Sequence, residues 1–482
     1  MSADWALLTP ELILVGAALA VWSLDLALPD QRKGLLSYLA ALALLAVAVA
    51  AATQAGLSAH LFGGLLRIDS YSVLFRVLFP VIGIVVCLAS TDYVRRRLTH
   101  PGEYYGIIMT SVLAMMVMSA AGELLTAYIA LELMSFTFYV LASYARHDLK
   151  SNEAGVKYVL LGALSSAVLL YGISLLYGAT GTTTFPGIAD AVRQGSALPT
   201  VFGLGLALVL AGFGFKVAAV PFHMWSPDVY EGAPAPVTAF LSVASKTAAF
   251  VLLLRLVTVG FMPAASEWRP LLAALAVVSM VVGNLVALAQ SNIKRLIAYS
   301  SIGHAGYLLL GFAALAPGAT LVSNGILFHL VGYAASNLAA FLVVIAVAAA
   351  TGKEELADYD GLAERAPLLA LAMAVAFFSS AGLPFFVGFT TKFYLFTVVV
   401  QAAPTLIWLV GLAAVMSLVS LYYYLVVIKR MYIHAAEGRE RVIPPMALSG
   451  LLVLLVAVIV ALGIYPEPLL NFIQSASRAL FA

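Results

Sequence analysis

Three lysines lie inside long apolar runs of this sequence: Lys216, Lys246 and Lys392. An ammonium group at the centre of a membrane-spanning helix costs roughly 2.5 to 3.5 kcal/mol on an insertion scale, so it is rarely placed there without a role. Lys216 and Lys246 also have no acidic residue within a helical turn. These two lysines are predicted to be functional, whereas Lys392 also fits a side chain that reaches a membrane interface.

Buried lysines are suited to proton transfer. The pKa of a free lysine is about 10.4, and burial lowers it by several units. A shift to about 7 corresponds to roughly 4.6 kcal/mol, which is about the work of moving one proton against a potential of about 200 mV. A lysine whose carboxylate partner approaches and withdraws can therefore take up and release protons, whereas a permanently paired lysine cannot.

Glu132 lies near the middle of another apolar run, TAYIALELMSFTFYV. It is interpreted as the partner that tunes the proton affinity of a lysine. The alternative is a carboxylate that pairs with a lysine only to hold helices together. Charged residues expected nearer the membrane interfaces are Glu123, Asp25, Lys157 and, as positively charged anchors, Lys294 and Arg295.

Histidines add a second type of proton carrier. His304 and His329 fall on adjacent predicted helices, and a neutral imidazole accepts at one nitrogen and donates at the other. A relay between lysines is the favoured interpretation, and a core pair or a haem site are the alternatives. His223, which follows Pro221, is a further candidate. Side chains suited to holding water along the same route are Tyr299, Ser300, Ser301 and Tyr307.

The composition is that of an integral membrane protein. Of 482 residues, 63% are hydrophobic and 10% are charged, with a mean hydropathy of +1.04, whereas soluble domains contain about 25% charged residues. The net charge of +2 does not indicate a nucleic-acid partner. The single cysteine, Cys87, excludes an internal disulfide, an iron–sulfur cluster and a thiolate zinc site, and no other metal site is predicted.

The predicted fold is an all-α polytopic membrane protein in which residues 1–482 form a single membrane domain. A span needs about 20 apolar residues. The first apolar segment lacks the basic front of a signal peptide and is expected to remain as a helix. Fourteen spans are predicted, at 10–28, 34–56, 71–91, 105–121, 124–144, 154–178, 200–220, 236–258, 268–289, 294–315, 319–350, 367–400, 404–428 and 444–464.

Two of these spans, helices 7 and 12, are predicted to be broken. Pro221 interrupts the seventh, and the Gly-Leu-Pro sequence 382–384 divides the twelfth, which is too long for a simple span. The eleventh is also long and is expected to be tilted. Spans four to eight (105–258) and nine to thirteen (268–428) each contain a broken helix with a lysine and then a further helix. Because five is odd, the second unit is predicted to be an inverted repeat of the first.

The charges of the loops predict the orientation. Sixteen Lys and Arg residues lie at one set of alternate loops and four at the other, which places both termini on the periplasmic side. The connection 223–236 lacks basic residues and is expected to fold into the protein, and the tail after Pro466 to lie on the membrane surface. The basic set is Arg32, Lys33, Arg95, Arg96, Arg97, Arg146, Lys150, Lys157, Lys294, Arg295, Lys353, Arg365, Lys429, Arg430, Arg439 and Arg441, and the other set is Arg67, Arg193, Arg269 and Arg478.

These segments together resemble the antiporter-like subunits of the bacterial respiratory NADH:quinone oxidoreductase (complex I), which are related to Mrp-type antiporters. The resemblance covers essentially the whole chain and favours subunit N. The lysine at 392 fits subunits N and L better than M, and no long lateral helix, as in subunit L, is expected after the fourteenth span. The segments that carry it are PELILVGAALAVWSLDL, ALELMSFTFYVLASY, GFGFKVAAVPFHMWSPDVYEGAPAPVTAFLSVASKTAAF, SNIKRLIAYSSIGHAGYLLLG and SSAGLPFFVGFTTKFYLF.

The resemblance implies a proton-translocating subunit with Glu132, Lys216, Lys246 and Lys392 as a central polar axis. It implies no redox cofactor in this chain, while NADH, FMN, iron–sulfur clusters and quinone belong to partner subunits. The expected partners are antiporter-like subunit M, small subunit K and the lipid bilayer of the bacterial inner membrane. The alternatives are an Mrp-type cation/proton antiporter subunit, the equivalent subunit of a related NAD(P)H or ferredoxin dehydrogenase complex, and a scaffold whose buried charges only specify helix packing.

Overall fold

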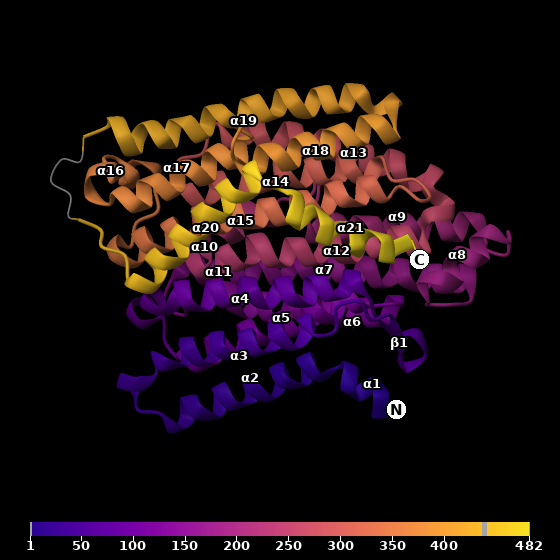
Figure 1. Cartoon of the computed structure of the whole chain (residues 1–482), viewed down its shortest axis with the longest axis horizontal. Helices are drawn as coiled ribbons and strands as arrows, with labels where there is room; N and C mark the ends of the chain where they lie inside the picture. The colour runs from indigo at the N-terminus through magenta and orange to yellow at the C-terminus, as the bar shows by residue number, and fades with distance from the viewer. Residues whose placement is uncertain (1, 436–440, 482) are drawn as a thin grey trace.

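The structure, a computed structural model, describes residues 2–435 and 441–481, so Arg439 of the basic set lies outside the described residues. The described chain is almost entirely helical, and its helices run side by side along the long axis of the molecule (Figure 1). A short antiparallel hairpin of β1 (Ala59–Leu61) and β2 (Leu66–Ile68) joins the second and third spans. The predicted all-α membrane fold is therefore confirmed.

Thirteen helical segments of the described residues are long and apolar enough to span a membrane, and the twelfth predicted span consists of two shorter apolar helices. Short helices outside the spans are α1 (Ser2–Leu7), α8 (Phe185–Arg193) and α16 (Leu362–Arg365). The unbroken spans are α2 (Thr9–Ala27), α3 (Leu35–Ala52), α4 (Ser70–Arg97), α5 (Pro101–Ala120), α6 (Leu124–Ala142), α7 (Leu149–Thr180), α13 (Ala265–Ala287), α14 (Ile293–Ala313), α15 (Thr320–Thr351), α19 (Ile407–Ile433) and α20 (Met446–Ile464).

The seventh and twelfth spans are broken, as predicted. The seventh consists of α9 (Pro199–Lys216) and α10 (Trp225–Gly232), and the twelfth of α17 (Pro367–Ala381) and α18 (Val387–Ala402). In the two connections, Ala218 (φ 57°) and Gly382 (φ 89°) have left-handed backbone conformations that do not continue a right-handed helix. The segment 217–220 at the first break is buried, so its backbone faces protein and not lipid.

The eighth span lies at the centre of the bundle. It comprises α11 (Ala235–Phe240), a π-helical segment (Leu241–Ser245), α12 (Lys246–Arg255) and a second π-helical segment (Leu256–Gly260). All residues of its most apolar 18-residue stretch are buried, whereas the buried share of the corresponding stretch is 94% in α14 and α15 and 22% in α19 and α20. The span that carries Lys246 therefore has no face left for lipid.

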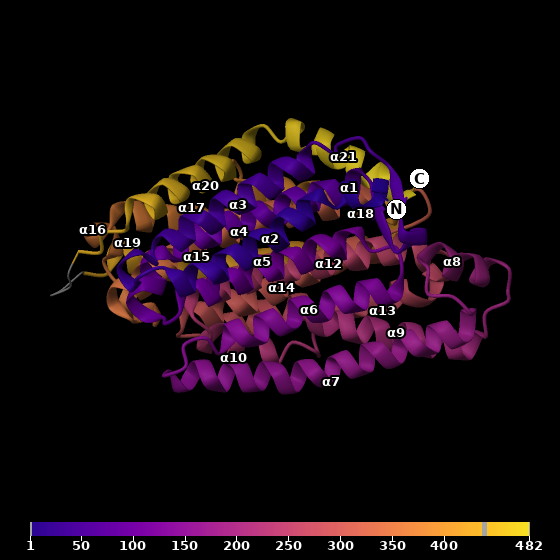
Figure 2. The ribbon, with the colours of Figure 1, turned by 90° about the horizontal axis from the view of Figure 1, so that it is seen from below.

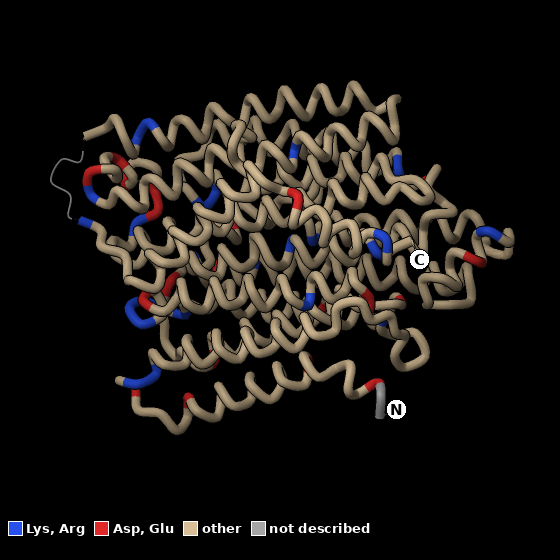
Figure 3. Tube along the Cα trace, in the orientation of Figure 1, with Lys and Arg blue, Asp and Glu red and all other residues tan. Residues whose placement is uncertain are grey.

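The two ends of the bundle differ in charge. Both termini lie at the same end (Figure 1). Lys and Arg residues gather mostly at the opposite end, where the α2–α3, α4–α5, α6–α7 and α13–α14 connections lie (Figure 3). The bundle thus has the charge asymmetry that the loop pattern predicts.

The α10 helix, the second half of the broken seventh span, forms most of the connection 223–236, which lacks basic residues. Trp225 and Val229 of this helix are buried, and Figure 2 shows α10 beside α7 at one edge of the molecule. The carboxylate of Asp228 pairs with Lys157 and Arg295, each at 2.7 Å. The connection is therefore folded into the protein, as expected.

The C-terminal helix, α21 (Glu467–Phe481), packs along α4 and α15. Its Ile473, Ala476 and Leu480 are at most 3% exposed, and Arg67 Nη2 donates to the carbonyl oxygen of Ala479 at 3.1 Å. The apolar side of this amphipathic helix is covered by protein. The expectation that the tail lies on the membrane surface is therefore wrong.

Candidate functional site

Lys216 is the last residue of α9, directly before the break in the seventh span. The side chain is 3% exposed, and its Nζ donates to Ser135 Oγ of α6 at 2.7 Å. The ring centroids of Phe215 and Tyr139 lie 5.6 and 5.9 Å from Nζ. Among the described residues no carboxylate forms an ion pair with this ammonium group, so its direct partners are a hydroxyl and two aromatic faces.

Glu132 lies one helical turn before Ser135 on α6 and is half-buried. Its Oε1 accepts a hydrogen bond from Ser166 Oγ of α7 at 2.6 Å. Residues three apart in a helix share a face, so Glu132 lies on the same side of α6 as Ser135, the partner of Lys216. Glu132 and Lys216 therefore do not form a permanent salt bridge that would only hold α6 to α9.

Lys246 begins α12, immediately after the first π-helical segment. It is 2% exposed, and its Nζ donates to the hydroxyl of Ser301 at 2.7 Å and to the Ser301 carbonyl at 3.0 Å. Single π-helical turns inside helices are frequent at functional sites. Here the turn precedes the lysine in the most buried span, and the ammonium group is again held by neutral oxygens.

The two histidines lie together, as predicted. His304 of α14, three residues after Ser301, has its Nδ1 3.4 Å from Nε2 of His329 on α15. Nδ1 of His329 lies 3.1 Å from Thr391 Oγ1 on α18. Two imidazole nitrogens in direct contact leave no space for a macrocycle between them, which favours the relay over haem ligation. This contact chain ends one residue before Lys392.

Lys392 lies in α18 beside the break in the twelfth span. It is 4% exposed, and its Nζ donates to Ser380 O at 2.8 Å and to Ser417 Oγ at 2.9 Å. Nζ is also 4.8 Å from the ring centroid of Tyr307. The side chain points into the bundle and does not extend to an interface, so the snorkelling alternative is wrong.

His223 is the one candidate that the structure leaves apart from the others. It is half-buried in the turn between α9 and α10, and its Nδ1 is buried without a hydrogen-bond partner among the described residues. No contact with a described residue joins it to the three lysines.

Four other cations are paired with carboxylates, and three of them, Lys294, Arg76 and Arg255, are buried. Lys294 and Arg295 are not simple anchors, because Lys294 is 2% exposed and pairs with Glu354 at 2.7 Å, and Arg295 pairs with Asp228. Sequence reasoning missed two arginines: Arg76, which binds Glu11 at 2.6 Å, and Arg255, which binds Asp69 at 2.8 Å. Both lie inside predicted apolar spans. The criterion that selected the lysines, a charged side chain within a long apolar run, would have selected these arginines as well.

The contrast between the two groups of cations decides what the arrangement can do. A cation that is paired with a buried carboxylate cannot lose its proton without leaving an unpaired anion in the interior. The three lysines have hydroxyl and carbonyl partners, which accept a hydrogen bond from an ammonium group and tolerate a neutral amine equally well. The lysine sites are therefore suited to protonation and deprotonation, and the arginine sites to holding helices together.

Comparison with known proteins identifies the family. The family model for "NADH:quinone oxidoreductase/Mrp antiporter, TM" matches residues 121–417. The NADH-quinone oxidoreductase subunit N of Moorella thermoacetica is 44% identical over 482 residues, which cover 99% of each chain. The chain belongs to the NADH-quinone oxidoreductase subunit N family.

Solved structures share this fold over nearly the whole chain. A chain of respiratory complex I from Thermus thermophilus with bound aureothin has a TM-score of 0.80 and 32% identity, and the match covers 96% of this chain and 99% of that one. A chain of an archaeal respiratory membrane complex, the membrane-bound sulfane sulfur reductase, has a TM-score of 0.87 and 26% identity, with 99% and 98% covered.

The paired charges give a stability prediction. Replacing Glu11 with Leu leaves the Arg76 guanidinium buried without its carboxylate, and we expect a loss of about 3–5 kcal/mol. The Glu11→Leu/Arg76→Met double variant should recover most of the loss and pump protons normally. Melting temperature and the amount of assembled complex are the measurements.

A surface pair is the control for this experiment. Glu103 and Arg146 pair at 3.2 Å with side chains 48% and 59% exposed, and exposed pairs contribute about 0–1 kcal/mol. Glu103→Gln should leave the melting temperature almost unchanged. A Glu11→Leu complex as stable as the wild type would contradict the structural role of the buried pair.

Proposed function

We propose that this chain is the proton-translocating membrane subunit of a bacterial NADH:quinone oxidoreductase. The observation that carries the proposal is the set of three buried lysines whose hydrogen-bond partners are neutral oxygens of the protein. Oxidation of NADH and reduction of quinone take place in other subunits of the complex. This chain is the driven proton path and not a redox catalyst on its own.

The proton path follows the contacts of the site. Glu132 and Ser135 form the acidic side of the Lys216 site, and Ser301 holds Lys246. His304 lies three residues after Ser301 on the same face of α14. The path continues through His329 and Thr391 to the neighbouring Lys392. Each imidazole accepts a proton at one nitrogen as it releases one from the other. Ordered water fills the steps that side chains do not bridge.

The path crosses two structural units. Residues 105–258 and 268–428 form two five-span repeats of opposite orientation, each with a broken helix next to a lysine. Support comes from the matching positions of the α9/α10 and α17/α18 breaks. In transporters built from inverted repeats, binding sites lie near the membrane midplane at the repeat interface. The lysine sites of the two repeats are expected at the same place.

The partners supply the redox chemistry. NADH, FMN, iron–sulfur clusters and quinone are bound by other subunits, and the neighbours in the membrane are antiporter-like subunit M and small subunit K. A single cysteine gives this chain no ligand set for an iron–sulfur cluster.

An Mrp-type cation/proton antiporter is the second candidate, because the family model that matches includes such proteins. It would use the same lysines with sodium held by oxygens. Among the described residues no group of three or more His, Cys, Asp or Glu side chains is placed to hold a metal ion. Sodium-dependent growth rescue of an antiporter-deficient host would favour this candidate over the proton subunit.

Lys216→Ala tests the proposed function. The alanine removes the amine that takes up the proton at this site, so NADH-driven proton uptake by inverted membrane vesicles should fall at least tenfold. Lys429→Ala, at an exposed position of α19, is the matched control and should pump normally. Wild-type pumping by an assembled Lys216→Ala complex would refute the proposal.

A further double variant separates a proton path from a scaffold. Glu132→Leu/Lys216→Met replaces both polar groups by apolar side chains of similar size. Full pumping by this variant would mean that the buried charges only specify helix packing.

Orientation is tested by labelling. We place the basic end of the bundle in the cytoplasm and both termini in the periplasm of a bacterial inner membrane. In a Cys87→Ser background, Ser196→Cys in the α8–α9 loop should react with a membrane-impermeant maleimide in intact spheroplasts. Thr99→Cys in the α4–α5 loop should react only in inverted vesicles. The reverse pattern would contradict this orientation.

A further inference from the structure

The π-helical turn Leu241–Ser245 sets the direction in which Lys246 points. Each residue of an α-helix turns the chain by about 100°, and a π-helical turn holds one residue more than an α-helical turn. If the π-helical turn lay beyond Lys246 instead of before it, the side chain would point about 100° away from its present direction. The contact of Nζ with Ser301 Oγ at 2.7 Å therefore depends on where this turn is held.

Two side chains of α15 bond to the π-helical turn. The Tyr333 hydroxyl donates to the Ser242 carbonyl at 3.0 Å, and Asn337 Nδ2 donates to Ser242 Oγ at 2.9 Å. Asn337 Nδ2 also donates to the Tyr333 hydroxyl at 3.1 Å, and Ser242 Oγ donates to the Ala239 carbonyl at 3.0 Å. These four hydrogen bonds form one network in which each hydroxyl both donates and accepts.

The network lies in the interior of the bundle. Ser242 is 0% exposed, Tyr333 5% and Asn337 6%. A buried amide or hydroxyl that loses its partner costs free energy, so these groups favour the arrangement that satisfies all of them. Moving the π-helical turn along the span would withdraw the Ser242 carbonyl and hydroxyl from α15. The network therefore stabilises the turn at its observed place.

The helix that carries Tyr333 and Asn337 is itself joined to the break in the twelfth span. Ser336 Oγ of α15 lies 2.8 Å from Ser379 Oγ of α17. The backbone N–H of Gly388, near the start of α18, donates to the same Ser379 hydroxyl at 3.0 Å. Helix α15 is thus bonded, directly or through one hydroxyl, to both halves of that span.

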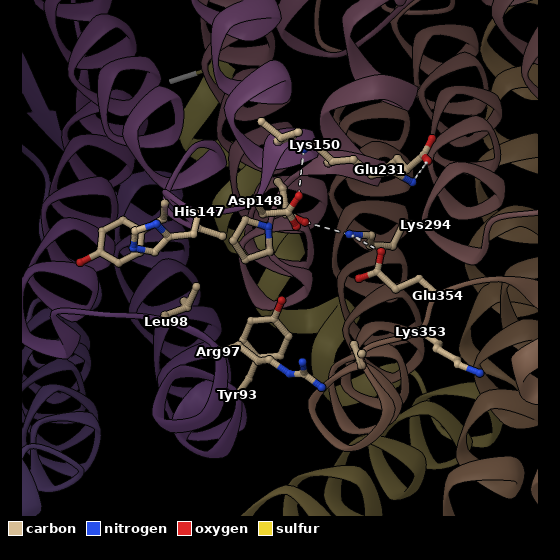
Figure 4. Close-up of a pocket in the computed structure, with 18 of the residues that line it drawn as sticks. Tyr93, Arg97, Leu98, His147, Asp148, Lys150, Glu231, Lys294, Lys353 and Glu354 are labelled. Atoms are coloured by element: carbon tan, nitrogen blue, oxygen red, sulfur yellow. Dashed lines mark hydrogen bonds and ion pairs between the residues drawn. The ribbon is translucent and has the colours of Figure 1, made fainter. Parts of the chain in front are cut away.

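The end of α15 is joined to α14, the helix that supplies Ser301. It lies at the basic end of the bundle, where Gly352, directly after α15, lines a cavity of about 970 Å³. Figure 4 shows Lys294 of α14 and Glu354 on the wall of this cavity, and they form an ion pair at 2.7 Å. The Ile293 amide also donates to the Glu354 carbonyl at 3.0 Å. The two helices are therefore held together at this end.

We propose that Tyr333 and Asn337 are positioning residues of the proton path. They hold the π-helical turn at the place that directs Lys246 toward Ser301, and α15, joined to α14, gives the turn a fixed reference. Neither side chain carries the proton. The inference rests on the proposed function and names the residues that keep one of its lysines aligned.

Asn337→Leu in the assembled complex tests this role, because it removes both amide hydrogen bonds at similar side-chain volume. We expect NADH-driven proton uptake by inverted vesicles to fall roughly fourfold, a factor typical of one lost hydrogen bond. The ratio of rates in H₂O and D₂O should rise, since proton transfer at a misdirected Lys246 becomes rate-limiting. Tyr333→Phe keeps the ring beside His304, with centroids 5.2 Å apart, and should change both quantities in the same direction.

Ser242→Ala shows whether Asn337 acts through the turn. It removes the acceptor of the Asn337 amide from the other side of the same contact. The Asn337→Leu/Ser242→Ala double variant should therefore be about as slow as the slower single variant. Independent effects would multiply to a loss of roughly sixteenfold.

Asn324→Leu is the matched control. Asn324 is a buried asparagine of the same helix, about 20 Å from Asn337 along the axis at 1.5 Å per residue. Its Oδ1 has no hydrogen-bond partner among the described residues. Complex assembly, proton uptake and the isotope ratio should all keep their wild-type values.

Three results would overturn the inference. The first is wild-type uptake by the Asn337→Leu and Tyr333→Phe complexes. The second is slower uptake with an unchanged isotope ratio, which indicates a structural effect only, and the third is a double variant whose losses multiply. If Asn337→Leu does not assemble, Tyr333→Phe decides by its rate and isotope ratio.

Lys246→Ala, measured in parallel, separates the two proposals. Pumping by Lys246→Ala removes the proposed function itself. Loss of pumping in Lys246→Ala with wild-type uptake in both α15 variants removes only the positioning role.

Discussion

The structure depends on one electrostatic constraint: three ammonium groups are held in an apolar bundle by neutral oxygens. Such a group is costly at this depth, and it is kept only if surrounding helices supply hydrogen-bond acceptors. Ser135, Ser301 and Ser417 supply the hydroxyl acceptors, each from a helix other than the one that carries the lysine. The packing of these helices is therefore inseparable from the lysine sites.

The irregular parts of the fold serve the same constraint. The break in the twelfth span makes backbone carbonyl groups available inside the bundle, and Lys392 uses the carbonyl of Ser380 there. The π-helical turn before Lys246 lies in the span with no lipid-facing surface. Backbone of this kind is tolerated at membrane depth only where protein or water covers it.

The paired charges of the interior have a different task. Arg76 with Glu11 and Arg255 with Asp69 join α2 to α4 and α12 to the start of α4. In each pair the carboxylate contacts the guanidinium group directly, so the arginine keeps its proton. The chain thus separates cations that fix helices from cations that can change protonation state, and the difference lies in their partners and not in their burial.

Much of this was predictable from the sequence. Apolar length predicted the spans, the Gly-Leu-Pro sequence 382–384 and Pro221 predicted the breaks, and the depth of Lys216 and Lys246 in apolar runs selected them. Ser301, the partner of Lys246, was among the side chains predicted along the route. Ser135 and Ser417 were not predictable, because a serine in a helix is ordinary and only tertiary packing shows which one faces a lysine. The packing of α21 on α4 and α15 was missed for the same reason, since an amphipathic helix has the same pattern against lipid or protein.

The most direct test of the account is a density map of the assembled membrane complex at a resolution that shows ordered water. The account predicts water in the gaps between Ser135, Ser301 and Thr391, with Nζ of all three lysines in hydrogen-bond contact with the resulting chain. Apolar side chains that fill those gaps, or lysine amines that point toward lipid headgroups, would contradict it.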